Sequence, residues 1–138
     1  MAWTRVEARA WAAGLFDGEG STSASDQWST PHLSVPQSGH TKPEVLVRFL
    51  EIVRVGSIRG PDITPGRQPY WCFGASGPKA VQILELLWPS LGPVKREQAE
   101  LILAAYRTHP TFSPRIARIT GRPLRLAKRR SRRSAANE

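Results

Sequence analysis

Two carboxylates stand between glycines at the end of the small and apolar stretch WAAGLFDGEGS, residues 11–21. Asp17 and Glu19, with Gly18 between them, could serve as a general acid and base. Alternatively, Glu19 and the free carbonyl oxygens at a helix end could offer the hard ligands that Mg²⁺ prefers. A calcium loop that begins at Asp17 is excluded, because Thr22 and Trp28 stand where it would need glycine and glutamate.

A helix must present these carboxylates, and the pair Thr4 and Glu7 has the spacing of a capping box at its start. Small residues then recur every four positions and would share one helical face. Glycine inside a helix costs about 1 kcal/mol relative to alanine, so a closely approaching backbone must offset that cost. We predict such an interface over Ala10, Ala13, Gly14, Asp17 and Gly18.

The rest of the pattern alternates strands and helices. We expect a hairpin from two extended stretches, about 21–29 and 32–37, and a further pair of strands at 56–60 and 68–76. Helices are predicted near 42–54, where Thr41 and Glu44 would form a second capping box, and near 78–88 and 94–108. This order predicts an α+β domain whose four-stranded antiparallel sheet is backed by helices.

Three stretches of the chain resemble one known family. AAGLFDGEG, residues 12–20, is similar to the signature of the LAGLIDADG homing endonucleases and matches it position by position as a conservative variant. LSVPQ, 33–37, resembles the second strand of that family, and VKREQAELIL, 94–103, resembles the segment that carries its active-site lysine. With the order of elements, the resemblance covers about 3–108 and implies an αββαββα fold that dimerises through the motif helix.

The resemblance assigns a role to several residues of the site. Glu19 takes the place of the metal-binding carboxylate, and Gly18 adds its backbone carbonyl. Lys95 takes the place of the basic residue near the scissile phosphate, and Gln37 that of the polar residue that positions water. Asp17 matches an acid that braces the paired helices. The implied cofactor is Mg²⁺, with Mn²⁺ as a substitute.

A single copy of the motif is present, and family members with one motif act as homodimers. Dimerisation would bring two Glu19 carboxylates together beside a two-fold axis, where divalent cations would relieve their repulsion. The implied activity is site-specific, metal-assisted hydrolysis of both strands of a DNA target with pseudo-two-fold symmetry. Enzymes of this kind serve intron or intein mobility.

One face of the predicted sheet is rich in hydroxyl and amide side chains, which can contact base edges in the major groove of DNA. Alternation along the first strand groups four polar residues on one face, and the later strands add further polar and basic side chains. The candidate DNA contacts are Ser23, Ser25, Gln27, Ser29, Arg59, Arg67, Gln68 and Tyr70, with Arg67 expected to meet phosphate.

The net charge of +9 is concentrated near the C-terminus. Residues 115–138 hold nine of the twenty Lys and Arg and one acid, which leaves a net charge of +1 on residues 1–114. We therefore expect an endonuclease domain at 1–110 and a basic, flexible tail at 111–138. Lys128, Arg129 and Arg130 of that tail are expected to bind nucleic acid, although a tail that only aids solubility is the alternative.

Composition limits the other functions. The single Cys72 excludes an internal disulfide, and the three histidines lack the spacing of zinc ligands. The apolar runs are too short for a membrane span and no signal peptide is visible, so we expect an intracellular protein, either cytoplasmic and nucleoid-associated or organellar. The alternatives are a DNA-binding protein that does not cleave, a maturase-like intron-splicing factor that binds RNA on the same fold, and a small basic protein that binds RNA through its tail.

Overall fold

The computed structural model describes residues 2–24 and 30–106. The described elements follow the predicted order, and the structure adds one short 3-10 helix before the last predicted helix. They are α1 (Arg5–Glu19), β1 (Ser21–Ala24), β2 (Pro31–Ser38), α2 (Glu44–Val53), β3 (Ser57–Asp62), β4 (Tyr70–Ser76), α3 (Pro78–Leu87), η1 (Trp88–Ser90) and α4 (Pro93–Tyr106). None of the described helices has both the length and the apolar character that a membrane crossing requires.

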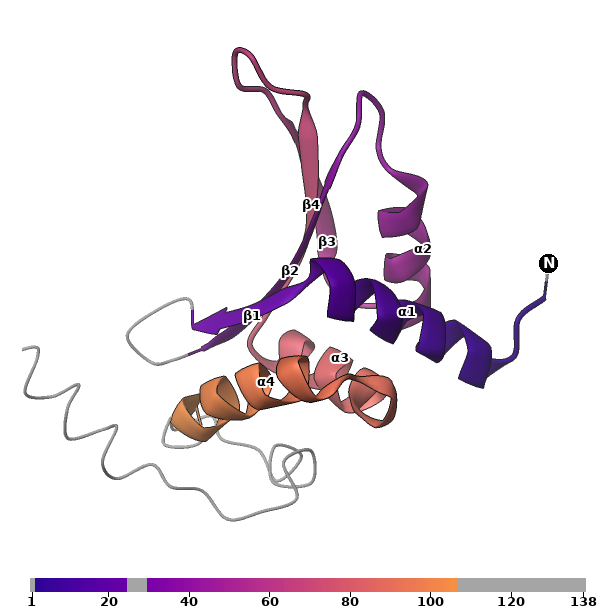
Figure 1. Cartoon of the computed structure of the whole chain (residues 1–138), viewed down its shortest axis with the longest axis vertical. Coiled ribbons are helices and arrows are strands. Elements are labelled where there is room, and N and C mark those ends of the chain that lie inside the picture. The colour runs from indigo at the N-terminus through magenta and orange to yellow at the C-terminus, as the bar shows by residue number, and fades with distance from the viewer. Residues whose placement is uncertain (1, 25–29, 107–138) are drawn as a thin grey trace, which may run out of the picture.

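The strands form one antiparallel sheet in the order β1-β2-β4-β3. The first residue of β1, Ser21, pairs with Ser34 of β2, so the start of β1 lies near the middle of β2. Gln37, near the end of β2, pairs with Trp71 of β4. The α-helices gather on one side of this sheet (Figure 1). The predicted α+β class, with an antiparallel sheet backed by helices, is therefore confirmed.

Helix α1 begins as the sequence predicts, whereas helix α2 does not. The Thr4 hydroxyl accepts from the Glu7 N–H at 3.1 Å, and the Glu7 carboxylate accepts from the Thr4 N–H at 2.8 Å. The second predicted capping box is wrong, because the N-cap of α2 is Pro43 and Glu44 is its first helical residue. A glutamate in that first position is not three residues past the cap, which is the spacing that a capping box requires.

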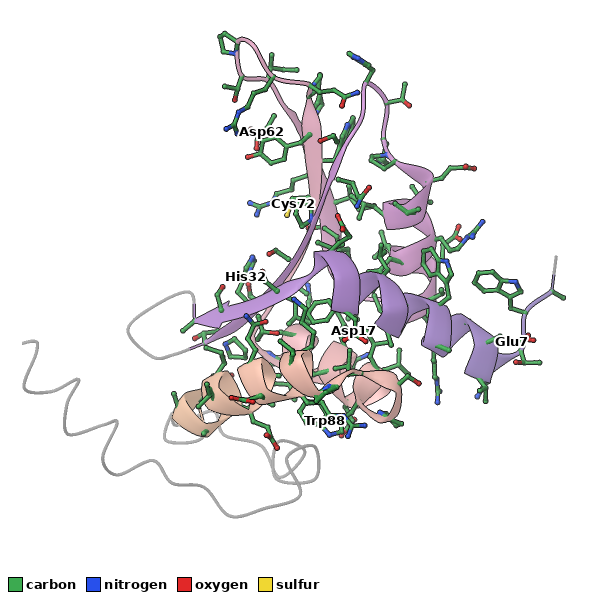
Figure 2. The ribbon with its side chains drawn as sticks, in the orientation of Figure 1. Glu7, Asp17, His32, Asp62, Cys72 and Trp88 are labelled. Carbon is green, nitrogen blue, oxygen red and sulfur yellow. The ribbon has the colours of Figure 1, made fainter. Side chains whose placement is uncertain are left out.

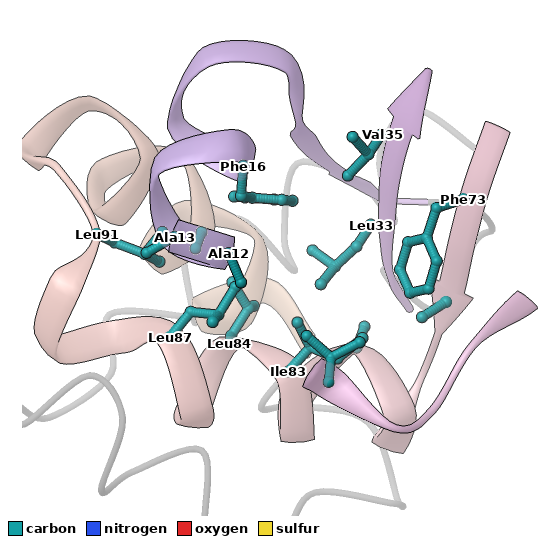
Figure 3. Close-up of a cluster of buried hydrophobic side chains, with 14 of the residues drawn as sticks. Ala12, Ala13, Phe16, Leu33, Val35, Phe73, Ile83, Leu84, Leu87 and Leu91 are labelled. Atoms are coloured by element: carbon teal, nitrogen blue, oxygen red, sulfur yellow. The ribbon is translucent and has the colours of Figure 1, made fainter. Parts of the chain in front are cut away.

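The core lies between the sheet and the helices. Figure 3 shows Phe16 of α1 facing Leu33 and Val35 of β2, with Phe73 of β4 beyond them and leucines of α3 beneath. The rings of Phe49 and Phe73 meet edge to face at 4.9 Å between centroids. Burial of these large side chains from every layer holds α1 against the sheet and so fixes where its C-terminal end points.

Buried and more exposed side chains alternate along the first five residues of β2. Leu33 and Val35 are fully buried beneath the helices, whereas His32 and Ser34 lie on the opposite face. His32, Cys72 and Asp62 mark this helix-free face along the side of the strands that points away from α2 (Figure 2). The sheet therefore offers one polar face to an external partner.

Candidate active site at the end of helix α1

The last turn of α1 delivers Glu19 to the edge of the core. Gly20 follows in an extended conformation, and its N–H donates to the Phe16 carbonyl at 2.8 Å. A Cβ on Gly20 would overlap the Phe16 ring, so this position has no room for a side chain. The chain can therefore pass directly from α1 into β1 over Phe16, which leaves the Glu19 carboxylate exposed at the turn.

The Glu19 carboxylate is held by β2. The Gln37 Nε2 donates to Glu19 Oε1 at 3.1 Å. Gln37 lies on the same face of β2 as the core residues Leu33 and Val35. It is near the end of the strand, past the apolar core, where it contacts the end of α1. This bond orients one carboxylate oxygen and leaves Glu19 Oε2 to other ligands. The structure thus brings together two of the residues that the resemblance assigns to the site.

Lys95 reaches the same place from α4. Its Nζ atom donates to the Gly20 carbonyl at 2.6 Å, and its side chain is half-buried. The ammonium group therefore lies beside the residue that follows Glu19. Gln37 of β2 bonds Glu19 and Lys95 of α4 bonds the next residue, so three elements meet at the end of α1, although 76 positions separate Glu19 from Lys95 in the sequence.

Helix α4 and the residue that precedes it contact the exit of α1 through successive polar bonds. The Gly92 N–H donates to both carboxylate oxygens of Asp17 at 3.0 Å, one turn before Lys95. One turn after Lys95, the Oε1 of Gln98 accepts from the Thr22 N–H at 3.1 Å. These bonds fix Lys95 against the α1–β1 junction. Sequence reasoning missed Gln98, because its partner is a backbone N–H that no motif marks.

The predicted interface face of α1 is only partly available. Ala10, Gly14 and Gly18 are exposed, and a Cβ on either glycine would meet nothing within 4 Å. The prediction that Ala13 belongs to the interface is wrong, because Ala13 is fully buried in the core of its own chain and cannot reach a partner. Asp17 is half-buried and bonds Gly92 of its own chain, so the bracing that this structure contains joins α1 to α4.

A hollow beside Glu19 contains several of the predicted DNA contacts. Its lining consists of Glu19, Pro36, Gln37, Ser38, Arg67, Gln68 and Tyr70. A hydrogen bond to the Asp62 carboxylate raises the pKa of the Tyr70 hydroxyl, and the negative charge of Asp62 adds to that effect. Tyr70 therefore stays protonated at neutral pH and acts as a hydrogen-bond donor there.

A second hollow lies over β2, β3 and β4 on the helix-free face. Arg59 and Lys79 are its cationic side chains, and Gly74 lies in its lining beside His32. The Nδ1 of His32 lies 2.6 Å from the Ser76 Oγ, which orients the imidazole. The sequence singled out Arg59 but missed His32, because strand alternation reveals a shared face only once the register is known. It also missed Lys79, which reaches the hollow from the start of α3.

The remaining predicted DNA contacts divide into two groups. Ser23 is exposed on the helix-free face, where it is the cross-strand partner of His32. Six residues lie outside the described ranges: Ser25, Gln27, Ser29, Lys128, Arg129 and Arg130. The predicted boundary at 110 and the basic tail lie outside those ranges as well.

The oxygen donors at the end of α1 fit Mg²⁺ in type but not in number. Glu19 supplies a carboxylate with one oxygen left by Gln37, and Gly18 is exposed beside it. Among the residues that the structure describes, no group of three or more His, Cys, Asp or Glu side chains could hold a metal ion. Mg²⁺ keeps several waters and is commonly bound by one or two carboxylates plus phosphate oxygens, so this donor set would need further oxygen ligands from outside the described residues.

Solved structures of homing endonucleases share this fold. No protein-family model and no curated protein matches the chain. I-CvuI with its DNA target in the presence of calcium is 21% identical, with a TM-score of 0.58 over 85% of this chain and 79% of that one. I-CvuI with the uncleaved I-CreI target in the presence of magnesium is 20% identical, with a TM-score of 0.61 over 96% and 95%. The chain therefore has the fold of the LAGLIDADG homing endonucleases.

Proposed function

We propose that this chain is a single-motif LAGLIDADG homing endonuclease. In this proposal a homodimer binds a DNA site with pseudo-two-fold symmetry and hydrolyses one phosphodiester bond in each strand with Mg²⁺, for which Mn²⁺ can substitute. The observation that supports the proposal is that three elements supply polar groups at the end of α1: Gln37 donates to Glu19 at 3.1 Å, and Lys95 donates to the carbonyl of the next residue at 2.6 Å. A fold alone does not define a function, but this combination of groups has a specific chemistry.

The exposed glycines of α1 support the dimer. Gly14 and Gly18 each lower helix stability by about 1 kcal/mol relative to alanine. Nothing in the described protomer approaches their missing side chains, unlike Gly20, where Phe16 excludes a Cβ. Backbone contact between two copies of α1 across a two-fold axis would account for both glycines. Because Gly18 precedes Glu19, such contact would also bring the two sites near that axis.

The groups at the site suit phosphodiester hydrolysis. Glu19 and the Gly18 carbonyl would hold the Mg²⁺, which when bound polarises the phosphate and lowers the pKa of water. Gln37 keeps the Glu19 carboxylate oriented and is available to orient the attacking water. Lys95 would stabilise the negative charge that grows on the phosphate oxygens. Water adds to phosphorus and releases a proton to solvent, the ester P–O bond breaks, and the leaving oxygen takes up a proton.

The helix-free face of the sheet is suited to DNA. Its described side chains are polar or small and include Ser23, Ser34, Arg59 and Tyr70, which can donate to or accept from base edges in the major groove. The I-CvuI structures that share this fold are complexes with DNA. We therefore assign DNA recognition to this face and cleavage to the end of α1.

A cleavage selection tests the proposal. A library of randomised DNA duplexes would be incubated with the full chain in Mg²⁺ and, in parallel, in EDTA. We expect Mg²⁺-dependent enrichment of cut sites that share a pseudo-palindromic pattern. Selective retention of uncut duplexes would instead support a DNA-binding protein that does not cleave. Selective binding of structured RNA, without DNA selectivity, would support a splicing factor.

A further inference from the structure

The hollow beside Glu19 is bordered on its far side by the turn between β3 and β4. Of the residues that line it, Glu19 and Arg67 are the charged ones at neutral pH, since Tyr70 stays protonated. We propose that Arg67 is a catalytic residue, whose guanidinium binds the non-bridging oxygens of the phosphodiester that is cleaved. This inference rests on the proposed function, because it assigns a further residue to the same site.

The turn that carries Arg67 is tied to the strand that carries Gln37. Gly39, two residues after Gln37, donates its N–H to the Pro69 carbonyl at 2.8 Å. The same residue accepts from the Trp71 indole N–H at 3.0 Å. Gly39 therefore joins the end of β2 to the β4 side of the turn. A displacement of the turn relative to Gln37 would break these bonds.

The turn itself has a defined conformation. The Arg67 N–H donates to the Thr64 carbonyl at 3.0 Å and closes a four-residue turn. Gly66 within it has φ +81°, a value that glycine adopts without steric strain. The backbone thus holds Arg67 beside the hollow, while its side chain remains exposed and able to reach a ligand.

Within the described part of the chain, the side chain of Arg67 has none of the tryptophan contacts that engage two other arginines. Arg48 lies over Trp3 and Trp11, with its guanidinium carbon 5.1 Å and 5.3 Å from the ring centroids. Arg96 donates to the Trp88 carbonyl at 2.8 Å and 3.1 Å. Those two side chains brace the fold, whereas Arg67 lines the hollow that contains Glu19.

A guanidinium can form paired hydrogen bonds to a phosphate, which the ammonium of Lys95 cannot. Lys95 carries a single ammonium that already donates to Gly20, whereas the planar fork of arginine can donate two parallel bonds to one phosphate. During hydrolysis the water oxygen bonds to phosphorus, the ester P–O bond breaks, and charge accumulates on the non-bridging oxygens. Arg67 would strengthen its bonds to those oxygens without transferring a proton, because arginine stays protonated.

The first test separates cleavage from binding. Single-turnover cleavage with saturating protein would be measured for Arg67→Ala and Arg67→Lys, and the Kd for target DNA would be measured in EDTA. Arg9→Ala is the control, because it removes one exposed positive charge from α1 far along the chain from this turn. We expect Arg67→Ala to slow cleavage about 100-fold to 1,000-fold, the range for removal of one preorganised donor. Its Kd should change less than about 10-fold, and Arg67→Lys should recover part of the rate.

A second measurement does not require cleavage. Neutral methylphosphonates would replace the central phosphates of the target one at a time, and binding would be compared between the wild type and Arg67→Ala. We expect one position in each strand at which the replacement weakens wild-type binding but leaves Arg67→Ala unaffected. A wild-type rate in Arg67→Ala, or a loss confined to Kd, would overturn the catalytic role. If the wild type cut no DNA and still lost affinity, through Arg67, at one methylphosphonate position, the proposed function would be refuted. That result would also overturn the catalytic role, because Arg67 would then be a phosphate contact only.

Discussion

The Nζ atom of Lys95 donates a 2.6 Å hydrogen bond to the carbonyl oxygen of Gly20, the residue that follows Glu19. This bond places a cation at the C-terminal end of α1, where the helix dipole and the unpaired carbonyls favour positive charge. On either side of Lys95, Gly92 just before α4 bonds Asp17, and Gln98 of α4 bonds Thr22. The position of Lys95 is therefore set by the fold before metal or DNA is bound.

Replacement of Lys95 by methionine keeps the length of the side chain but removes its charge. We expect single-turnover cleavage to fall at least about 100-fold, since a positive charge near the phosphate is lost. DNA affinity should change by less than about 10-fold. Glu97→Gln, an exposed neighbour on the same helix, is the matched control. Cleavage at the wild-type rate by Lys95→Met would remove Lys95 from the site.

Replacement of Gly14 by leucine should separate the protomers. The substitution meets nothing within the described protomer and improves helix propensity, so the single chain should fold at least as well as before. Sedimentation velocity should show a monomer where the wild type shows a dimer. Arg9→Leu, a substitution elsewhere on the surface of α1, should leave the dimer intact. A dimeric Gly14→Leu protein would place the interface somewhere else.

Two glycines that flank Glu19 should respond differently to alanine. At Gly20 a Cβ overlaps the Phe16 ring, whereas at Gly18 it meets nothing within 4 Å of the protomer. We expect Gly20→Ala to lower the free energy of unfolding by about 1–3 kcal/mol, as overpacking does. Urea denaturation at concentrations where the chain is monomeric would show Gly18→Ala to be unaffected or more stable. Equal stability of the two variants would contradict the packing at Gly20.

Deletion of residues 111–138 should weaken DNA binding without removing its selectivity. These residues carry nine of the twenty Lys and Arg, so the truncated chain should release fewer counterions on binding. We expect a shallower dependence of log Kd on log salt, measured by fluorescence anisotropy from about 50 to 200 mM salt. If selective binding disappeared entirely, recognition would belong to the tail and not to the sheet.

The fold could be predicted because its signals are local. Thr4 and Glu7 mark the start of α1, and alternating apolar residues such as Leu33 and Val35 mark a buried strand face. The motif at 12–20 fixed the position of Glu19 within its helix, and the resemblance assigned Gln37 and Lys95 to the same site. Short-range patterns of this kind depend on backbone geometry that the sequence encodes directly.

The contacts that could not be predicted are long-range or depend on small differences of angle. Ala13 and Gly14 are neighbours of similar size, but a rotation of about 100° along the helix puts one in the core and leaves the other exposed. The bonds from Gln98 to Thr22 and from Gly92 to Asp17 link groups about 75 positions apart. The prediction of a second capping box was wrong because it required Thr41 to be the N-cap, three residues before Glu44. The N-cap of α2 is Pro43 instead.

Substitution of Glu19 by glutamine tests the central claim most directly. Glutamine keeps the shape and an oxygen that can accept from Gln37, but it removes the negative charge that Mg²⁺ requires. Mg²⁺-dependent cleavage and DNA affinity of the selected target would be measured side by side. The account predicts a dimer that binds this DNA with near wild-type affinity and shows no detectable cleavage. Undiminished cleavage by Glu19→Gln would contradict it.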